Sequence, residues 1–268
     1  MLLRTCTALV ALVVTSLPAQ AKLGVEHIEA AYGPLLPERK ALEYVSQDLI
    51  FFRYLVTGAK VDEQGNVNVE ALVQLTDANG KEVSKQTLPF KGTLSLGGDS
   101  FSGSAYIVVG EQFLAGTYTL SVTLTDLLAS QKVAFQREVK VRSAEFAVVF
   151  PRFSYDLEGR VLAPAGGLVN QTLHFRIGAV GFDRSQEKVD LVSHVQLLDT
   201  QGKELLPKAL ETIVKVDDPK VVKTTSMANF SGSLGLHRPG EFTLRITVTD
   251  RLAQKTATFE MPLRVKLP

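Results

Sequence analysis

The chain has 268 residues, of which 45% are hydrophobic and 21% are charged, which is the composition of an ordinary globular protein. Its 29 Lys and Arg residues are balanced by 28 Asp and Glu residues, and the net charge of +1 lacks the basic excess typical of nucleic-acid-binding proteins. We therefore expect no nucleic-acid partner. The length is enough for one large domain or for two of moderate size.

Residues 1–21 have the pattern of a signal peptide that is cleaved on export. Arg4 precedes an apolar run over residues 8–17, and the segment ends in the small-x-small triplet of residues 19–21. The run is shorter than the roughly 20 apolar residues that span a bilayer, and no later segment reaches that length. We expect an exported protein, periplasmic, at the cell surface or secreted, with no transmembrane segment after cleavage.

The only cysteine, Cys6, lies inside this predicted signal peptide. After cleavage the chain would contain no thiol, no disulfide and no cysteine-ligated metal. Many exported proteins are stabilised by disulfides, whereas this one would depend on burial of a hydrophobic core. Domains of roughly 120 residues are large enough for that.

The rest of the chain contains four blocks of sequence that occur twice, in the same order. In chain order they are FFRY and HFRI, near Phe52 and Phe175; VQLTDANGKEV (73–83) and VQLLDTQGKEL (195–205); FSGS, from Phe101 and from Phe230; and GTYTLSVTLTD (116–126) and GEFTLRITVTD (240–250). Chance does not produce four matched blocks in one order. The sequence therefore predicts a tandem duplication, with domains at residues 22–143 and 144–268.

Within each block, apolar residues recur at every second position. In residues 116–126 the apolar set is Tyr118, Leu120, Val122 and Leu124, separated by Thr and Ser. This period is typical of half-buried strands, because successive side chains of a strand point to opposite faces. DANG and DTQG read as turns, with Asp first and Gly fourth. We count about seven strands and little helix in each copy, which predicts an all-β fold of two antiparallel β-sandwiches.

Two segments, residues 22–39 and 146–167, are less regular. Each is interpreted as a first strand followed by a crossover that contains proline. The connection between the copies, around residues 142–145, is short and contains no Gly/Ser or Pro tract. We therefore expect the two domains to touch.

The stretch Gly116-x-Tyr118-x-Leu120 resembles the penultimate strand of an immunoglobulin-type domain. In that fold the tyrosine hydrogen-bonds back across the turn, and a cysteine occupies the position of Leu120. Phe242 replaces the tyrosine in the second copy, and Leu244 occupies its cysteine position. The chain is thus similar to bacterial extracytoplasmic immunoglobulin-like or fibronectin-III-like repeats, which implies tandem Ig-like sandwiches and an exported location, and no active site.

Candidate catalytic and metal-binding residues are few. The histidines His174 and His194 fall on predicted outer faces, and neither has a second ligand at metal-site spacing. FSGS lacks a neighbouring base, so we interpret it as the end of a strand beside a close backbone approach at Gly103 and Gly232. We expect no catalytic, cofactor-binding or metal-binding residues, and no enzymatic activity.

Two acidic pairs also suggest turns and not ligand sites. VDEQGN contains Asp62 and Glu63, and VDDPK contains Asp217 and Asp218. Neither has the alternating aspartates of a calcium loop, while Asp, Gly and Pro are the usual residues of turns.

One strand of the first copy carries an apolar pair on its outer face. If Phe101 and Ala105 face inward, Tyr106 and Val108 face outward. The pair marks either a contact surface or a place where the strand packs against the neighbouring domain or a loop. We prefer the second reading, because single exposed apolar residues are normal.

Together these observations predict an exported, non-enzymatic structural or interaction module of tandem Ig-like domains. Its partner would be a protein or a component of the cell envelope, bound by exposed strand edges and loops. One alternative is an exported hydrolase with carboxylate chemistry in its loops. Another is an accessory or ligand-binding module, for glycan or metal, of an extracytoplasmic hydrolase system.

Overall fold

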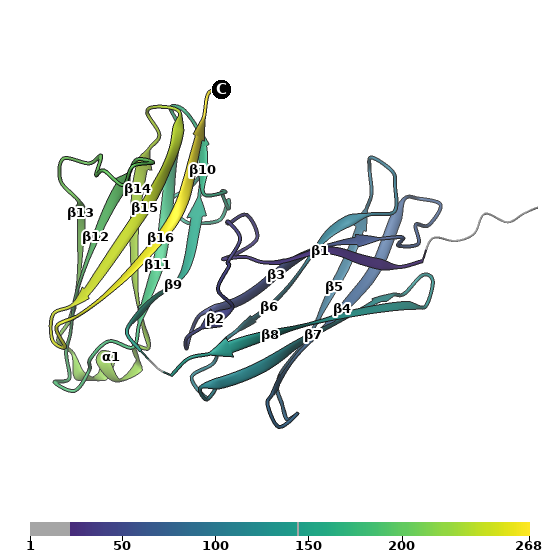
Figure 1. The fold of residues 1–268 in the computed structure, drawn as a ribbon, viewed down its shortest axis with the longest axis horizontal. Helices are drawn as coiled ribbons and strands as arrows, with labels where there is room; N and C mark the ends of the chain where they lie inside the picture. Colours follow the sequence, from purple (N-terminus) through teal and green to yellow (C-terminus); the bar gives the residue numbers. More distant parts are fainter. Residues whose placement is uncertain (1–21, 144) are drawn as a thin grey trace, which may run out of the picture.

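A computed structural model describes residues 22–143 and 145–268. The predicted signal peptide and Cys6 lie outside these residues. The fold is all β, with 59% of the residues in strands and 2% in helix. The strands form two β-sandwiches that follow one another along the chain (Figure 1).

The first sandwich consists of a three-stranded and a five-stranded sheet. The three-stranded sheet has the order β1 (Gly24–Ala30), β3 (Leu49–Thr57) and β6 (Phe101–Val108). The five-stranded sheet has the order β2 (Glu43–Tyr44), β8 (Gln131–Val141), β7 (Gly116–Asp126), β4 (Asn66–Asp77) and β5 (Glu82–Thr93). All pairs are antiparallel except β2 with β8, which is parallel.

The second sandwich repeats this topology strand for strand. Its three-stranded sheet has the order β14 (Met227–Gly235), β11 (Thr172–Val180) and β9 (Ala147–Ser154). Its five-stranded sheet has the order β10 (Gly166–Leu168), β16 (Lys255–Lys266), β15 (Gly240–Asp250), β12 (Val189–Leu198) and β13 (Leu210–Val216). The sequence predicted about seven strands in each copy; the eighth in each is the short strand β2 or β10.

A short helix, α1 (Pro219–Thr224), lies between β13 and β14 and interrupts the match between the copies. Its N-cap is Asp218, whose side chain accepts a hydrogen bond from the backbone N–H of Lys220 at 2.8 Å. The prediction of a turn at Asp217 and Asp218 is therefore wrong in detail: Asp218 begins a helix, as aspartates before a proline at N1 commonly do.

The predicted alternation is confirmed in the central strands. Leu120 and Leu244, at the cysteine position of immunoglobulin domains, are 0% and 1% exposed. Val73 lies opposite Val122 in the first sandwich, and both side chains are buried as the alternation predicted. Aliphatic packing therefore occupies the place of a disulfide in both cores.

The predicted tyrosine hydrogen bond and the predicted turns are also present. The hydroxyl of Tyr118 donates to the backbone carbonyl of Leu114 at 2.7 Å. In DANG, the N–H of Gly80 donates to the carbonyl of Asp77 at 2.9 Å, which closes the turn from its first to its fourth residue.

The prediction for FSGS needs a correction. The motif opens β6 and lies inside β14, so it does not end a strand. Its glycines face rings of the neighbouring strand: a Cβ on Gly103 would lie 2.3 Å from the ring of Tyr54, and one on Gly232 would lie 2.4 Å from the ring of Phe175. In the sequence match of FFRY with HFRI, Phe175 corresponds to Phe52. Gly232 lies opposite Phe175, whereas Gly103 lies opposite Tyr54, two residues after Phe52. The pairing of β11 with β14 therefore differs in register by two residues from that of β3 with β6.

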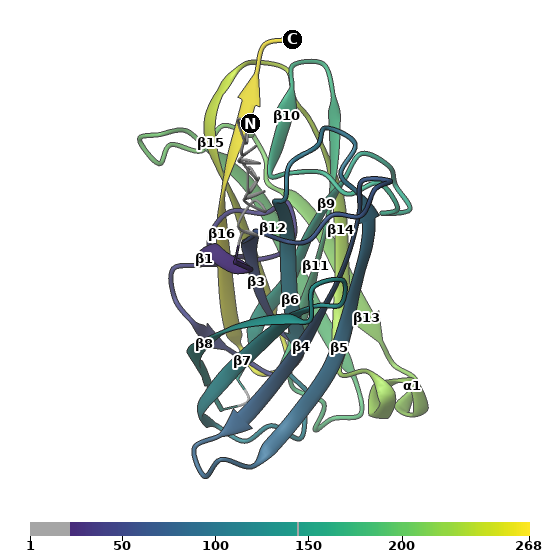
Figure 2. The same ribbon diagram turned by 90° about the vertical axis from the view of Figure 1, so that its right-hand side faces the viewer.

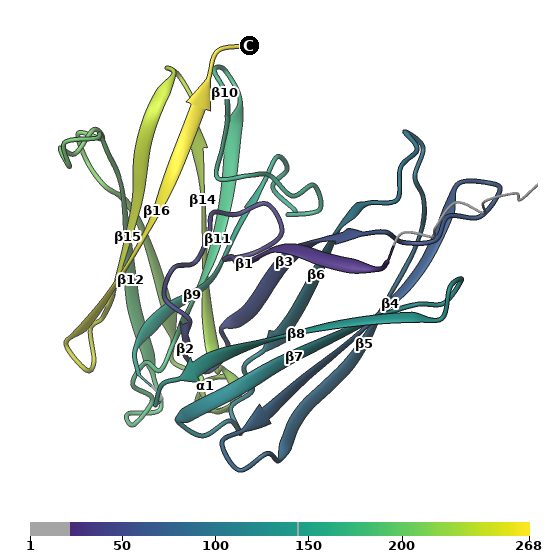
Figure 3. The same cartoon turned by 45° about the vertical axis from the view of Figure 1, so that its right-hand side comes forward.

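The two sandwiches meet at an angle, close together where β8 leads toward β9 and further apart beyond it (Figure 1). The segment of residues 31–42, called here the crossover segment, leaves the first sandwich after β1 and reaches the second (Figure 3). The strands β3 and β6 on one side, and β9 on the other, border the space between the sandwiches.

Candidate functional site: a groove between the sandwiches

The crossover segment joins the two hydrophobic cores. Leu36 belongs by sequence to the first copy, but it is 5% exposed and is part of the core of the second sandwich. The ring of Tyr32 meets that of Phe259 edge to face, with centroids 5.3 Å apart. The predicted contact between the copies is therefore present, and it consists of apolar side chains of one sandwich inserted against the other.

A buried ion pair holds the end of the crossover segment in place. The guanidinium of Arg39 lies 2.7 Å from the carboxylate of Asp48, and the two side chains are 12% and 7% exposed. The same guanidinium lies 4.1 Å from the ring centroid of Tyr44 and 5.2 Å from that of Tyr32. A buried guanidinium that is paired and stacked in this way has few alternative positions, so the segment is fixed on the first sandwich.

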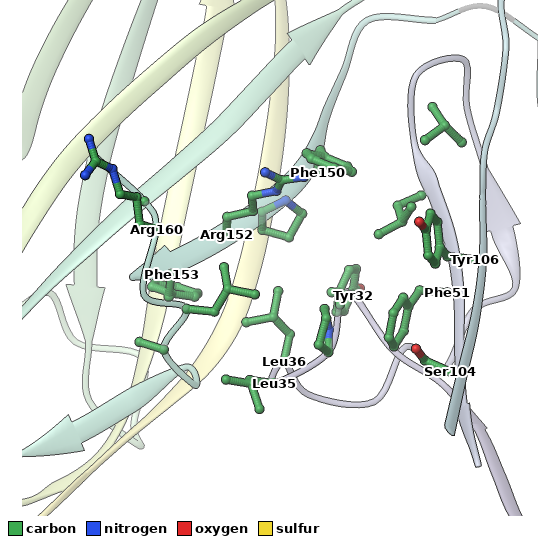
Figure 4. Close-up of a pocket in the computed structure, with 18 residues that line it drawn as sticks. Tyr32, Leu35, Leu36, Phe51, Ser104, Tyr106, Phe150, Arg152, Phe153 and Arg160 are labelled. Atoms are coloured by element: carbon green, nitrogen blue, oxygen red, sulfur yellow. The ribbon is translucent and has the colours of Figure 1, made fainter. Parts of the chain in front are cut away.

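Beyond these contacts a groove of about 530 Å³ opens between the sandwiches (Figure 4). It is called here the central groove, and the residues used in the argument below are Leu35, Tyr106, Val108, Arg152, Arg160 and Leu162. One wall consists of the outer faces of β3 and β6. The crossover segment forms the floor, and β9 with the loop of residues 155–163 forms the other wall. Its volume lies within the ~300–1,000 Å³ usual for ligand sites.

Exposed apolar side chains from both sandwiches line this groove. Tyr106 and Val108, the outward pair predicted on β6, are 40% and 48% exposed and stand on its first wall. Leu35 on the crossover segment is 49% exposed, and Leu162 on the opposite loop is 42% exposed. The preferred expectation, that the pair packs against the neighbouring domain or a loop, is wrong: the pair faces that domain across a groove and stays accessible.

The second wall carries positive charge. Arg152 on β9 lies opposite Arg176 on β11, and Arg160 follows in the adjoining loop. Burial, together with the nearby charge of Arg176, lowers the pKa of the Arg152 guanidinium. The guanidinium lies 4.2 Å from the ring centroid of Phe150, so one of its faces is covered by an aromatic ring.

Three of the free strand edges, which we expected to bind partners, are poorly suited to that role. β5, at the outer edge of the first sandwich (Figure 2), contains Pro89, and β9 contains Pro151 next to Phe150 with a φ of 55°. β1 has an irregular register around His27, whose φ is 49°. At these three edges prolines and bulges interrupt the ladder that an added strand would need, so the groove offers a better surface than they do.

The candidate residues from the sequence lie apart from one another. His174 contacts the hydroxyl of Ser233 at 2.7 Å on β14, and His194 contacts Glu211 at 3.1 Å on β13. Within residues 22–143 and 145–268 there is no group of three or more His, Cys, Asp or Glu side chains that could hold a metal ion.

The acid of the first predicted turn serves the loop itself. Asp62 accepts hydrogen bonds from the backbone N–H groups of Asn66 at 2.8 Å and Gln64 at 2.9 Å, and these bonds lower the pKa of its carboxyl. Its turn role is therefore confirmed.

In the part of the chain that the structure describes, α1 is the only helix, and at six residues it is too short to cross a membrane. No protein-family model and no curated protein matches the sequence. Among solved structures, the chain is similar over 93% of its length to red sea bream transglutaminase, of which it covers 32%, with 9% identity and a TM-score of 0.29. It is also similar over 90% of its length to the whole C-terminal domain of the AgI/II polypeptide BspA of Streptococcus agalactiae, with 9% identity and a TM-score of 0.29. Likenesses this distant carry no argument about function.

Proposed function

We propose that the protein is an exported, non-enzymatic interaction module that binds a protein or another component of the cell envelope in its central groove. The export signal predicted at residues 1–21 supports the location, and the tandem sandwiches support the role of a binding scaffold. The domains of this proposal are residues 22–143 and 144–268, with the crossover segment of the first docked on the second.

One observation carries the proposal. Four accessible apolar side chains, from three separate parts of the chain, converge on one groove: Leu35, Tyr106, Val108 and Leu162. Exposed apolar residues scattered singly need no explanation, but a cluster of them in a groove of ligand-site volume marks a binding surface. The contacts of Leu36 and Arg39 set the position of its two walls, so the surface exists before a partner binds.

Site-specific photo-cross-linking in the producing cells tests this proposal. A photoreactive amino acid is placed at Val108, in the groove, and separately at Ile213 on β13, at the outer edge of the second sandwich (Figure 1). The two side chains are matched, at 48% and 46% exposed. We expect a discrete adduct of higher mass from position 108 and none from position 213.

The same adducts from both positions, or none from position 108, would contradict the proposal. Mass spectrometry of the adduct gives the class of the partner. Because the assay depends on proximity alone, its outcome is independent of the charge on the groove.

A further inference from the structure

The two walls of the central groove have different chemistry. The wall formed by β3 and β6 presents apolar side chains, among them Phe51, Tyr106 and Val108. The wall formed by β9 and its adjoining loop carries Arg152 and Arg160; the guanidinium of Arg152 lies beside Phe150, and that of Arg160 is at the outer end of this wall, directed away from Tyr106 (Figure 4). A ligand that satisfies both walls must be apolar on one side and anionic on the other.

The arginines of this wall are not neutralised by the protein itself. Arg152, Arg160 and Arg176 form no salt bridge with any carboxylate of residues 22–143 or 145–268. Elsewhere, eleven basic residues of the described chain have an acidic partner within 4.0 Å. They are Arg39, Arg53, Lys85, Lys140, Arg142, His194, Lys215, Lys223, Arg245, Arg251 and Arg264, counting His194 as charged only when protonated.

The two acids of the same loop do not pair with these arginines. The carboxylate of Asp156 accepts the backbone N–H groups of Arg160 at 2.9 Å and Val161 at 3.2 Å, so it serves the turn. Glu158, the other acid of the loop, forms no ion pair within the described chain. Arg176 instead donates to the carbonyl of Leu157, which fixes the loop against β11.

A bound carboxylate would remove an unfavourable arrangement. Arg152 is partly desolvated and lies beside another cation, Arg176, a combination that costs free energy unless an anion is near. Guanidinium groups bind carboxylates with two parallel hydrogen bonds, and these charge-assisted bonds are about twice as strong as neutral ones.

We infer that the central groove binds an extended peptide segment of the partner in which apolar and acidic side chains alternate. Successive side chains of an extended strand point to opposite sides, so one set would contact Tyr106 and Val108 while the other reaches Arg152, with Arg160 at the outer end of the same wall. The inference rests on the proposed function and names the chemistry of its partner.

The test uses three pools of synthetic peptides, each on the order of eight residues, or ~26 Å when extended. In the first pool Leu, Val or Phe alternates with Asp or Glu; in the second the acids are replaced by Lys or Arg; in the third the apolar residues are replaced by Ser. Binding to the purified protein is measured by fluorescence anisotropy at two salt concentrations. We expect only the first pool to bind, more weakly at high salt.

Two variants locate the site. Arg152→Gln combined with Arg160→Gln is expected to weaken binding of the first pool by about tenfold or more, because two charge-assisted contacts are lost. The matched control is Arg137→Gln on β8, a half-buried arginine that also lies against a ring, 5.9 Å from the centroid of Phe135. It is expected to leave binding unchanged, and circular dichroism melting confirms that each variant is folded.

Each other outcome overturns the inference. Equal binding of the basic pool, or retention of affinity in the arginine double variant, shows that charge does not select the ligand. Binding of none of the pools excludes an alternating peptide, and a concentration-dependent dimer lost in the double variant would identify a second copy of the chain as the occupant. If position 108 still cross-links a partner in cells, the proposed function survives while this inference fails.

Discussion

The carboxylate of Asp126 accepts a hydrogen bond from the backbone N–H of Lys60 at 2.7 Å, although the side chain is fully buried. Its other oxygen accepts two backbone N–H groups of the turn after β7, at 2.8 and 3.1 Å. In the second sandwich Asp250 does the same, with the N–H of Asp183 at 2.7 Å. One side chain thus ties the loop that leaves the three-stranded sheet to a turn of the five-stranded sheet, which explains why both copies of the long motif end in aspartate.

Asp126→Asn is expected to lower the free energy of unfolding by roughly 1–3 kcal/mol, because an amide offers one acceptor oxygen and leaves a buried N–H without a partner. Urea unfolding, followed by circular dichroism, measures the loss. The control is Asp62→Asn, which also removes a carboxylate that accepts backbone N–H groups, but in an exposed loop where water can replace it. Equal unfolding midpoints for the two variants would refute this account.

Leu36→Ala should destabilise the second sandwich although the residue precedes it by more than a hundred positions in the chain. The side chain fills part of that core, and deleting a buried leucine costs about 2–5 kcal/mol. Hydrogen exchange of the amides of β11 and β15 reports on this sandwich separately. Leu35→Ala, at a side chain that is 49% exposed, is the neighbouring control and should leave exchange unchanged.

If exchange in β11 and β15 is the same in Leu36→Ala as in the wild type, the cores are not coupled. If it is faster, the second domain alone, residues 144–268, should also be less stable than within the full chain, since it lacks the crossover segment.

Local patterns of the sequence predicted the sandwiches because their signals are local. The alternation around Leu120 specifies a strand and its buried face, and it holds whichever strand lies next to it. The hydrogen bond of Tyr118 spans only four residues, so its acceptor, the carbonyl of Leu114, lies two residues before the motif and is placed by the same local stretch of chain.

The groove could not be predicted in this way, because its walls come from segments that are distant in the sequence. Tyr106 and Arg152 share a groove only through the angle between the sandwiches, which depends on where Leu36 inserts. The outward pair on β6 was visible as a pattern, but nothing local distinguished packing from exposure. The register shift at FSGS was hidden for the same reason, since register is a property of two strands and not of one motif.

Replacing Arg39 tests the ion pair that fixes the crossover segment. Arg39→Met leaves the carboxylate of Asp48 buried without its partner, a change that typically costs about 3–5 kcal/mol. In the background of Asp48→Asn the same replacement should cost much less, because no buried charge is left behind. Thermal and urea unfolding of the four proteins of this cycle measure the coupling, and equal losses in both backgrounds would show that the pair does not contribute.

The hydroxyl of Tyr44 is buried and has no hydrogen-bond partner among the residues that the structure describes. An unsatisfied buried hydroxyl destabilises the folded state, so Tyr44→Phe is expected to be neutral or stabilising near neutral pH. The ring that stacks on the guanidinium of Arg39 is kept in this variant. A loss of stability on this substitution at pH 7 would show that the hydroxyl is satisfied in solution.

Tyr44 also gives the protein a defined alkaline sensitivity. Burial raises its pKa to about 12, whereas an unfolded tyrosine loses its proton near pH 10. A folded pKa above the unfolded one stabilises the fold below pH 10, and this contribution is lost as the pH rises toward 12, at about 1.4 kcal/mol per pH unit. Because lysines and Tyr54, whose pKa burial also raises to about 12, titrate over the same range, the informative quantity is the difference between the wild type and Tyr44→Phe. Between pH 10 and 12, the difference in unfolding free energy measured by urea titration should shift further in favour of the variant. The control is Tyr155→Phe, at a residue that is 43% exposed. A difference that stays constant with pH would mean that Tyr44 ionises as easily in the folded state as in the unfolded one.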